Sequence, residues 1–193
     1  MRRRLGTSAP RQPHVPTFPD ARASAVLIAL ADGPQGAEVL LTKRSMDLRN
    51  HRGEISFPGG RVDSGETYEQ TALREADEEV ALPGDQLDLI GRLDPLSTVV
   101  SRSYIVPVVA TLSGTPPSLQ ASAAEVDRIL WVPLAELTRA DTYREEWWGT
   151  APLDRPMFFF HLDDETVWGA TARIIHQLLR VALDVDSPEP PTW

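Results

Sequence analysis

The sequence of 193 residues contains no cysteine. This absence excludes disulfide scaffolds, cysteine-ligated zinc, iron–sulfur clusters and thiol nucleophiles. Long hydrophobic runs are also missing, because the longest one, residues 25–31, is far shorter than the roughly 20 residues of a membrane-spanning helix. Lysine is scarce as well: Lys43 stands alone, so 18 of the 19 basic residues are arginine. We therefore expect a protein without a membrane-spanning segment and without sulfur-based chemistry.

Charge is divided unevenly along the chain, whose net charge is −9. Residues 1–61 carry 10 basic and 5 acidic residues, whereas residues 62–193 carry 9 basic and 23 acidic ones. A nucleic-acid-binding protein needs a continuous basic face, so we expect no nucleic-acid partner. A basic segment followed by an acidic one instead fits a small anionic ligand held beside a cation.

The length and the hydrophobic content of 41% fit a single domain. We expect this domain over residues 23–183. Residues 1–22 are rich in arginine and proline and have no apolar stretch behind the arginines, so they predict a flexible arm rather than a signal peptide. Residues 184–193 predict a proline-rich tail. Without a recognisable export signal, we expect a cytoplasmic protein.

Hydrophobic periodicity predicts a mixture of strands and helices. β-branched and aromatic runs predict strands over residues 23–30, 38–42, 54–57, 87–92, 103–112, 126–132 and 156–162. A helical period predicts helices over residues 67–80 and 168–183. The pattern indicates an α/β fold in which helices cover a mixed β-sheet.

The first of these helices carries several carboxylates on one face. At about 100° per residue, Glu75, Glu78 and Glu79 fall within roughly a third of the circumference, opposite the apolar positions. They lie near the C-terminal end, where the helix dipole disfavours acids. A solvated acidic surface is one explanation of such a cluster. A hard divalent cation is another, because Mg²⁺ prefers oxygen ligands from carboxylates and substrate phosphates.

The whole segment around this helix resembles the Nudix box, G-x5-E-x7-R-E-U-x-E-E-x-G-U, in which U is an aliphatic residue. The matching residues are Gly60, Glu66, Arg74, Glu75, Ala76, Glu78, Glu79 and Leu82. One position departs from the pattern, because Ala81 stands where the family has glycine. The resemblance implies the Nudix fold, an α/β/α sandwich with a mixed β-sheet and a loop-helix-loop Nudix box.

Nudix hydrolases cleave a diphosphate linked to another moiety, using Mg²⁺ or Mn²⁺ and a water nucleophile. The resemblance implies that the catalytic and metal-binding residues are Glu75, Glu78 and Glu79. It also implies that Gly60, Glu66 and Arg74 support the structure of the box. The general base stays open, and its candidates are Glu78, Glu145, Glu146, Asp164 and Glu165.

The segment just before the box, residues 40–60, resembles a second motif. It matches every fixed position of L-L-T-x-R-[S/A]-x3-R-x3-G-x3-F-P-G-G, which marks the coenzyme A pyrophosphatase subgroup of Nudix hydrolases. The segment concentrates positive charge, and arginine is suited to bidentate phosphate contacts. Some of these cations are equally well explained by pairing with surface carboxylates. The expected substrate-binding residues are Lys43, Arg44, Arg49, His51 and Arg61.

Together the two motifs imply metal-dependent hydrolysis of coenzyme A and its acyl derivatives. The expected products are adenosine 3′,5′-bisphosphate and 4′-phosphopantetheine or its acyl form. One alternative is a Nudix hydrolase for ADP-ribose, NADH or dinucleoside polyphosphates. A second alternative is a Nudix module that binds nucleotides without turnover. In each case the partner is a small molecule, and a homodimer is compatible with the sequence although no residue locates an interface.

Overall fold

The computed structural model describes residues 18–99, 101–150 and 155–183. The arm expected over residues 1–22 falls outside the described residues up to residue 17, and the tail expected over residues 184–193 does so entirely. Two β-sheets and flanking helices make up the described part. The predicted α/β class is therefore confirmed.

The larger sheet is mixed and has eight strands, with the central order β3-β2-β1-β7-β5. β4 pairs with β1, β6 with β7 and β8 with β2. β1 and β7 run parallel, and their pairing is the longest in the sheet. The strands are β1 (Arg22–Gly33), β2 (Gly36–Arg44), β3 (Ile55–Ser56), β4 (Gly59–Arg61), β5 (Leu87–Arg92), β6 (Leu96–Ser97), β7 (Ser103–Leu112) and β8 (Val126–Pro133).

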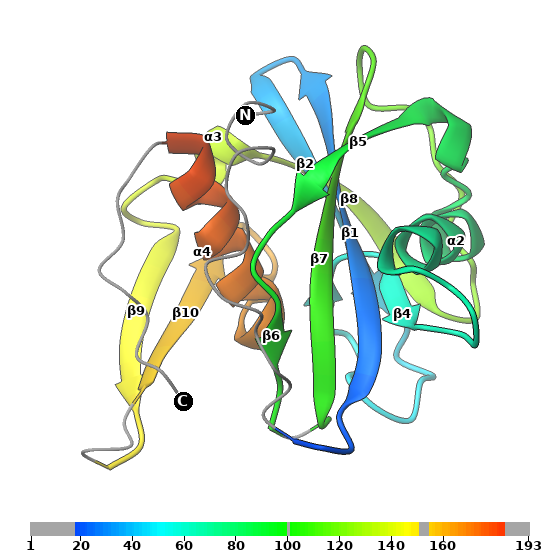
Figure 1. Ribbon diagram of the computed structural model, residues 1–193. Helices are drawn as coiled ribbons and strands as arrows, with labels where there is room; N and C mark the ends of the chain where they lie inside the picture. Colours follow the sequence, from blue (N-terminus) through cyan, green and yellow to red (C-terminus); the bar gives the residue numbers. More distant parts are fainter. Residues whose placement is uncertain (1–17, 100, 151–154, 184–193) are drawn as a thin grey trace.

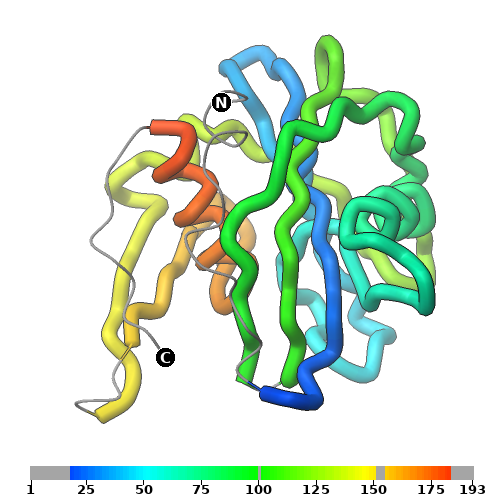
Figure 2. The backbone as a smooth tube through the Cα atoms, in the orientation of Figure 1, coloured from blue at the N-terminus to red at the C-terminus, as the bar shows by residue number. Residues whose placement is uncertain are grey.

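A smaller antiparallel sheet and the helices complete the structure. The small sheet has the order β11-β10-β9. Figure 1 shows α2 on one side of the large sheet, with α4 and the small sheet on the other, and Figure 2 traces the same layers along the chain. These elements are β9 (Tyr143–Trp148), β10 (Arg155–His161), β11 (Thr166–Val167), α2 (Tyr68–Val80), the 3-10 turn η1 (Gly84–Gln86), α3 (Leu134–Leu137) and α4 (Gly169–Leu183).

Alternate side chains of β1 explain this layering. Leu27 belongs to a buried cluster that includes Ala76 of α2. Its neighbour Ile28 belongs to a second cluster that includes Ile175 and Leu178 of α4. Because successive side chains of a strand point to opposite faces, α2 and α4 cover opposite faces of the sheet. The predicted sandwich is confirmed.

Several parts of the secondary structure differ from the prediction, among them the short elements β6, β11 and α3, which were not predicted. The strand expected over residues 54–57 is shortened to β3, which pairs with β2. The unpredicted strand β4 follows Pro58 and pairs with β1. β9 was not predicted at all, since its central residues Glu145 and Glu146 are charged. It forms through backbone pairing with the aromatic strand β10. No helix in the described ranges is long and apolar enough to cross a membrane.

Candidate active site

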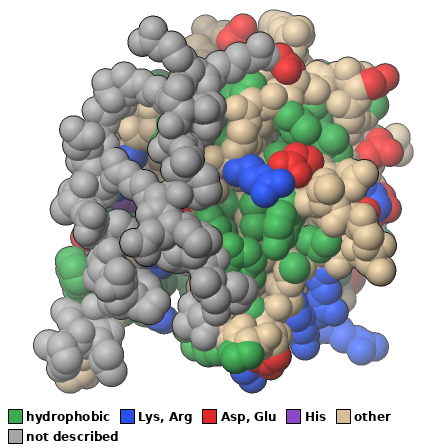
Figure 3. Space-filling view, viewed as in Figure 1, with side chains coloured by type: hydrophobic (Ala, Val, Ile, Leu, Met, Phe, Trp, Pro, Cys, Tyr) green, Lys and Arg blue, Asp and Glu red, His purple; other side chains and the backbone are tan. Residues whose placement is uncertain are grey.

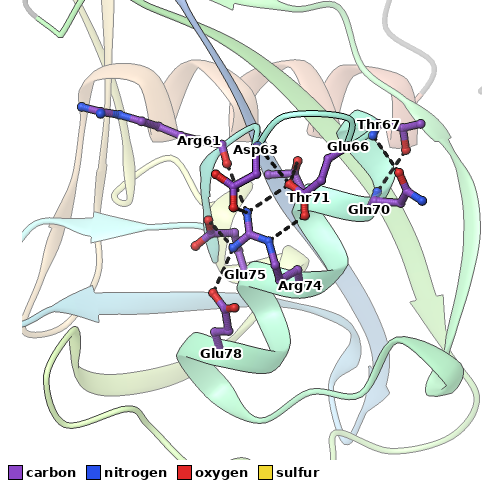
Figure 4. A network of polar contacts seen from close by, with 9 residues as sticks. All are labelled: Arg61, Asp63, Glu66, Thr67, Gln70, Thr71, Arg74, Glu75 and Glu78. Atoms are coloured by element: carbon purple, nitrogen blue, oxygen red, sulfur yellow. Dashed lines mark hydrogen bonds and ion pairs between the residues drawn. The ribbon is translucent and has the colours of Figure 1, made fainter.

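Both ends of α2 are fixed by local hydrogen bonds. At its start, Gln70 N–H donates to Thr67 Oγ1 over 3.2 Å, and Thr67 N–H donates to Gln70 Oε1 over 2.8 Å (Figure 4). This capping box satisfies amide groups that the helix leaves free. At its end, Ala81 adopts the left-handed conformation with φ 54° and ψ 43°, and its N–H donates to Asp77 O over 2.9 Å. Alanine thus takes the backbone conformation that glycine adopts most readily.

Arg74 lies at the centre of a network of carboxylates (Figure 4). Its Nε donates to Glu66 Oε1 over 2.8 Å, and its Nη1 donates to Glu75 Oε1 and to Glu78 Oε2, each over 2.9 Å. Its Nη2 donates to the backbone carbonyl of Arg61 over 3.2 Å. One arginine therefore ties the loop after β4 to the helix and supplies part of the positive charge that the acidic face needs.

Glu66 is the best-satisfied carboxylate of this network. Besides Arg74, it accepts hydrogen bonds from Thr71 Oγ1 over 2.7 Å and from Asp63 N–H over 3.1 Å. The hydrogen bonds from Arg74 and Thr71 lower the pKa of Glu66 to about 2. This geometry makes Glu66 a brace between loop and helix.

Glu79 is in a different environment from the other acids of α2. Its side chain is 3% exposed, whereas the side chain of Glu78 is 59% exposed. The expectation that the acids share a face opposite the apolar positions is therefore wrong for Glu79. The reason is that β4 and the end of β2 cover this side of α2, as the contacts of Glu79 with Gly59 N–H at 3.3 Å and with Arg44 Nη1 at 3.7 Å show. Burial raises the pKa of Glu79 to about 8, and Arg44 only partly opposes this rise.

Glu75 lies against Gly60. A Cβ atom at Gly60 would lie 2.2 Å from Glu75 Oε1, closer than any real contact, so a side chain there would displace the carboxylate. Burial also raises the pKa of Glu75, against the opposing effect of Arg74. The glycine of the box thus provides the space in which this carboxylate lies.

The charge of a third carboxylate acts on Glu75 and Glu79. The charge of Glu125 contributes to the raised pKa of both residues. Glu125 directly precedes β8, and its carbonyl accepts a hydrogen bond from Ser45 N–H over 2.8 Å. Sequence reasoning missed it, because no spacing relates it to the box. Its segment is docked on the end of α2, where Ser122 N–H donates to Glu79 O over 2.8 Å.

The donor set fits a hard divalent cation. Among the described residues, no group of three or more His, Cys, Asp and Glu side chains converges closely enough to form a metal site by itself. Glu75 and Glu79 nevertheless offer carboxylate oxygens whose charge is incompletely compensated, as their raised pKa values indicate. Mg²⁺ and Mn²⁺ prefer such oxygen ligands.

The predicted substrate-binding residues of β2 point to opposite faces of the sheet. Arg44 faces α2, and in the part of the chain that the structure describes its buried Nε has no hydrogen-bond partner. Lys43 points the other way, and its Nζ donates to Glu165 Oε1 over 2.7 Å. Arg44 thus lies beside the carboxylates of α2, whereas Lys43 is engaged in an ion pair on the opposite face of the sheet.

His51 and Arg61 lie elsewhere, on the wall of a cavity of about 390 Å³. His51 Nδ1 lies 2.9 Å from Glu54 Oε2. Arg49 is exposed and does not line this cavity. The described residues that line it are Asp20, Arg22, Asn50, His51, Arg61, Ser101, Arg102 and Ser103.

The candidates for the general base are distributed over three places. Glu78 is exposed beside Arg74. Glu145 and Glu146 lie on β9, where each accepts a hydrogen bond from a neighbouring aromatic side chain. Asp164 and Glu165 follow β10 and are both paired with Arg128, on the face of the sheet opposite Glu79. Of this set, Glu78 is the acid in contact with the network around Arg74.

Comparison with known proteins agrees with this geometry. Residues 21–150 match the NUDIX domain family. The chain is 38% identical over 161 residues to a Photorhabdus laumondii protein named "Uncharacterized Nudix hydrolase NudL", with 81% of this chain and 83% of that protein covered. The chain belongs to the Nudix family. This Nudix protein is also similar in structure to the Mycobacterium smegmatis Nudix hydrolase RenU, with a TM-score of 0.60, 23% identity, and 87% of this chain and 89% of that one covered.

A second solved structure, a Caenorhabditis elegans Ap4A hydrolase in a binary complex, has a TM-score of 0.50 and 26% identity. The similarity covers 58% of this chain and 80% of that one. Membership of the family makes this chain a Nudix hydrolase of diphosphate bonds in nucleoside diphosphate derivatives. Nudix hydrolases generally use divalent metals such as Mg²⁺ or Mn²⁺.

Proposed function

We propose that this Nudix hydrolase cleaves the diphosphate of coenzyme A and its acyl derivatives. Water adds to one phosphorus as the bridging P–O bond breaks, which gives adenosine 3′,5′-bisphosphate and 4′-phosphopantetheine or its acyl form. The observation that carries the proposal is the distance of 3.7 Å between Arg44 Nη1 and Glu79 Oε1. It joins the arginine of the coenzyme A motif to the carboxylates of the Nudix box.

Glu75 and Glu79 are the residues that would hold Mg²⁺ or Mn²⁺. When bound, the cation supplies charge neutralisation at the diphosphate and activation of the attacking water. The side chain of Arg44 is 25% exposed and its Nη1 lies beside Glu79, so the exposed part of the guanidinium can donate to a diphosphate oxygen. Arg74 keeps Glu75 and Glu78 in place through the hydrogen bonds from Nη1.

In this proposal the general base is either Glu78, a candidate from the sequence, or Glu125, which the sequence did not indicate. Glu78 is exposed next to Glu75 and can reach a water in the site. Glu125 lies close enough to raise the pKa of Glu75 and Glu79. Asp164 is a poor base, because the hydrogen bond from Arg128 lowers its pKa. Glu165 is engaged by Lys43 and Arg128 on the face of the sheet opposite Glu79.

Product analysis by mass tests the proposal. The enzyme is incubated with Mg²⁺ or Mn²⁺ and, in parallel, with coenzyme A, 3′-dephospho-coenzyme A, ADP-ribose, NADH and diadenosine polyphosphates. We expect coenzyme A to be cleaved preferentially, to adenosine 3′,5′-bisphosphate and 4′-phosphopantetheine. Preference for another substrate removes the coenzyme A assignment and leaves the Nudix hydrolase.

The second candidate function is hydrolysis of dinucleoside polyphosphates, which the similarity to an Ap4A hydrolase favours. Binding of nucleotides without turnover on any substrate would instead favour the non-catalytic module. A cytoplasmic location and a homodimer stay predictions, for which the oligomeric state in solution and the location of the expressed protein are the measurements.

A further inference from the structure

The cavity lined by His51 and Arg61 lies at one edge of the large sheet. The parallel strands β1 and β7 both begin there, with Arg22 paired to Ser103. β4 runs antiparallel to β1 and brings Arg61 to the same edge, opposite Ser24. Figure 3 shows Lys and Arg side chains gathered at the lower right of the molecule, and β1 and β7 begin at the lower edge in Figure 1. The topology thus gathers residues far apart in the sequence.

The charge of the cavity is strongly positive. Its described lining includes Arg22, Arg61 and Arg102 against a single acid, Asp20. Asp20 Oδ1 accepts from Arg102 Nη2 over 2.6 Å. No ion pair joins the side chain of Arg22 or Arg61 to another described residue. The cavity therefore has more cationic side chains than its own carboxylate neutralises.

The backbone around the cavity is strained. Among the described residues other than glycine, the positive φ angles are those of His51 at 55°, Ala81 at 54° and Arg102 at 49°. Ala81 ends a helix, whereas His51 and Arg102 both line the cavity. Arg102 is held in this conformation partly by Arg22 N–H, which donates to its carbonyl over 2.9 Å. Residues in sparsely populated backbone regions cluster at sites that clamp ligands.

We propose that this cavity is a subsite for a phosphate monoester of the substrate, bound by Arg22, Arg61 and Arg102. A phosphate monoester carries a charge of about −2 and accepts several charge-assisted hydrogen bonds, so it suits a group of arginines. The inference rests on the proposed function, under which this group is the 3′-phosphate of coenzyme A. Lys43 and Arg44 do not line the cavity.

The subsite is joined to the Nudix box through Arg61. The backbone carbonyl of Arg61 accepts from Arg74 Nη2 over 3.2 Å, and its side chain points away from that network (Figure 4). The backbone of Arg61 therefore contacts Arg74, which holds the carboxylates, and its side chain lines the cavity. A substrate with one anionic group at the carboxylates and another in the cavity fits this arrangement.

The test is the preference for a 3′-phosphate in Arg22→Gln and in the double variant Arg22→Gln/Arg61→Gln. We expect the ratio of kcat/KM for coenzyme A to kcat/KM for 3′-dephospho-coenzyme A to fall about 10-fold in the single variant and further in the double one. The matched control is Arg139→Gln, because Arg139 is an exposed arginine paired with Asp141 and outside the cavity. The control should keep the wild-type ratio.

A binding measurement separates this inference from the proposed function. Calorimetry without metal compares adenosine 3′,5′-bisphosphate with adenosine 5′-monophosphate, and we expect wild-type protein to prefer the bisphosphate and Arg22→Gln to lose this preference. Should the enzyme cleave coenzyme A while the variants keep both the ratio and the preference, the subsite is overturned and the proposed function stands. Should wild type leave coenzyme A intact, the proposed function falls, and a preference for bisphosphate that Arg22→Gln removes still supports the subsite.

Discussion

Arg44 and Glu79 face each other between the end of β2 and the end of α2, with 3.7 Å between Arg44 Nη1 and Glu79 Oε1. This separation is longer than a charge-assisted hydrogen bond, so the pair is in electrostatic contact rather than closely bonded. The one other polar contact of the carboxylate given by the described residues is Gly59 N–H at 3.3 Å. A buried carboxylate with so little compensation is a place where a divalent cation gains much from binding.

Glu79→Gln tests this relationship. The amide keeps an oxygen that accepts from Gly59 N–H, so we expect the fold to persist by circular dichroism. Metal-dependent turnover should fall by about 100-fold or more, since losing a group that only supports a metal ligand already costs about 10- to 100-fold. The measurement is kcat/KM on the substrate that the panel identifies, as a function of Mg²⁺ and Mn²⁺ concentration.

The matched control for that variant is Glu69→Gln. Glu69 lies on the same helix, but its carboxylate pairs with Arg92 on β5. Turnover close to that of wild type is expected for the control. Near wild-type turnover in Glu79→Gln would remove Glu79 from the metal site.

We predict opposite effects for the substitution of Glu125 and of Glu165: the first should affect catalysis and the second stability. Glu125→Gln should lower kcat about 10-fold or more, because its charge lies close to Glu75 and Glu79. Glu165→Gln should leave kcat within about threefold of the wild-type value. It should lower the free energy of unfolding by about 1–3 kcal/mol, because it weakens the hydrogen bonds that this largely buried side chain accepts from Lys43 and Arg128. Steady-state kinetics and urea unfolding measure both. A large loss of kcat in Glu165→Gln, with stability unchanged, would reverse the two assignments.

Acid unfolding should reveal the brace between Glu66 and Arg74. The pKa of Glu66 is lowered from 4.5 to about 2, so the folded state takes up this proton less readily than the unfolded state. Its contribution to stability is therefore full above about pH 4.5 and is lost as the pH falls toward 2. We expect Glu66→Gln to flatten the fall in Tm over this window.

The control for the fall in Tm at low pH is Asp85→Asn. Asp85 is an exposed acid of η1 and does not contact Glu66 or Arg74. Its Tm should fall with pH in parallel with wild type. An unchanged slope in Glu66→Gln would mean that the brace contributes nothing to acid stability.

The sequence predicted the box helix well, because capping, periodicity and motif all concern neighbours along the chain. It wrongly placed Glu79 opposite the apolar positions, although Glu79 follows the buried Ala72 by seven residues and so lies only about 20° from it around the helix. It also did not predict the strand β9, whose charged residues pair only through the backbone.

Long-range placement accounts for the remaining differences. The segment that carries Glu125 is docked on the end of α2, because Gln120 and Ser122 donate to the last carbonyls of the helix over 3.1 and 2.8 Å. Arg22 meets Arg61 because β1 pairs with β4. Contacts of this kind between distant residues depend on which strands pair, and hydrophobic periodicity alone does not reveal the pairing. The coenzyme A motif places Lys43, Arg44 and His51 in one segment of the sequence. In the structure Arg44 lies beside Glu79, Lys43 pairs with Glu165, and His51 lines the cavity.

Ala81→Gly is the most direct test of the one departure from the Nudix box. Ala81 holds φ at 54°, and a left-handed conformation costs a residue with a Cβ roughly 1–2 kcal/mol. Glycine removes this cost. It also increases the conformational entropy of the unfolded chain, which lowers the stability of the folded state by about 0.4–1 kcal/mol. The net stabilisation should be about 0.5–1 kcal/mol, or about 1–4 °C in Tm for a protein of this size. Ala124→Gly, at an exposed residue outside the positive φ region, should instead lower Tm slightly. A lower Tm in Ala81→Gly as well would show that the methyl group at this position stabilises the helix end more than its backbone conformation costs.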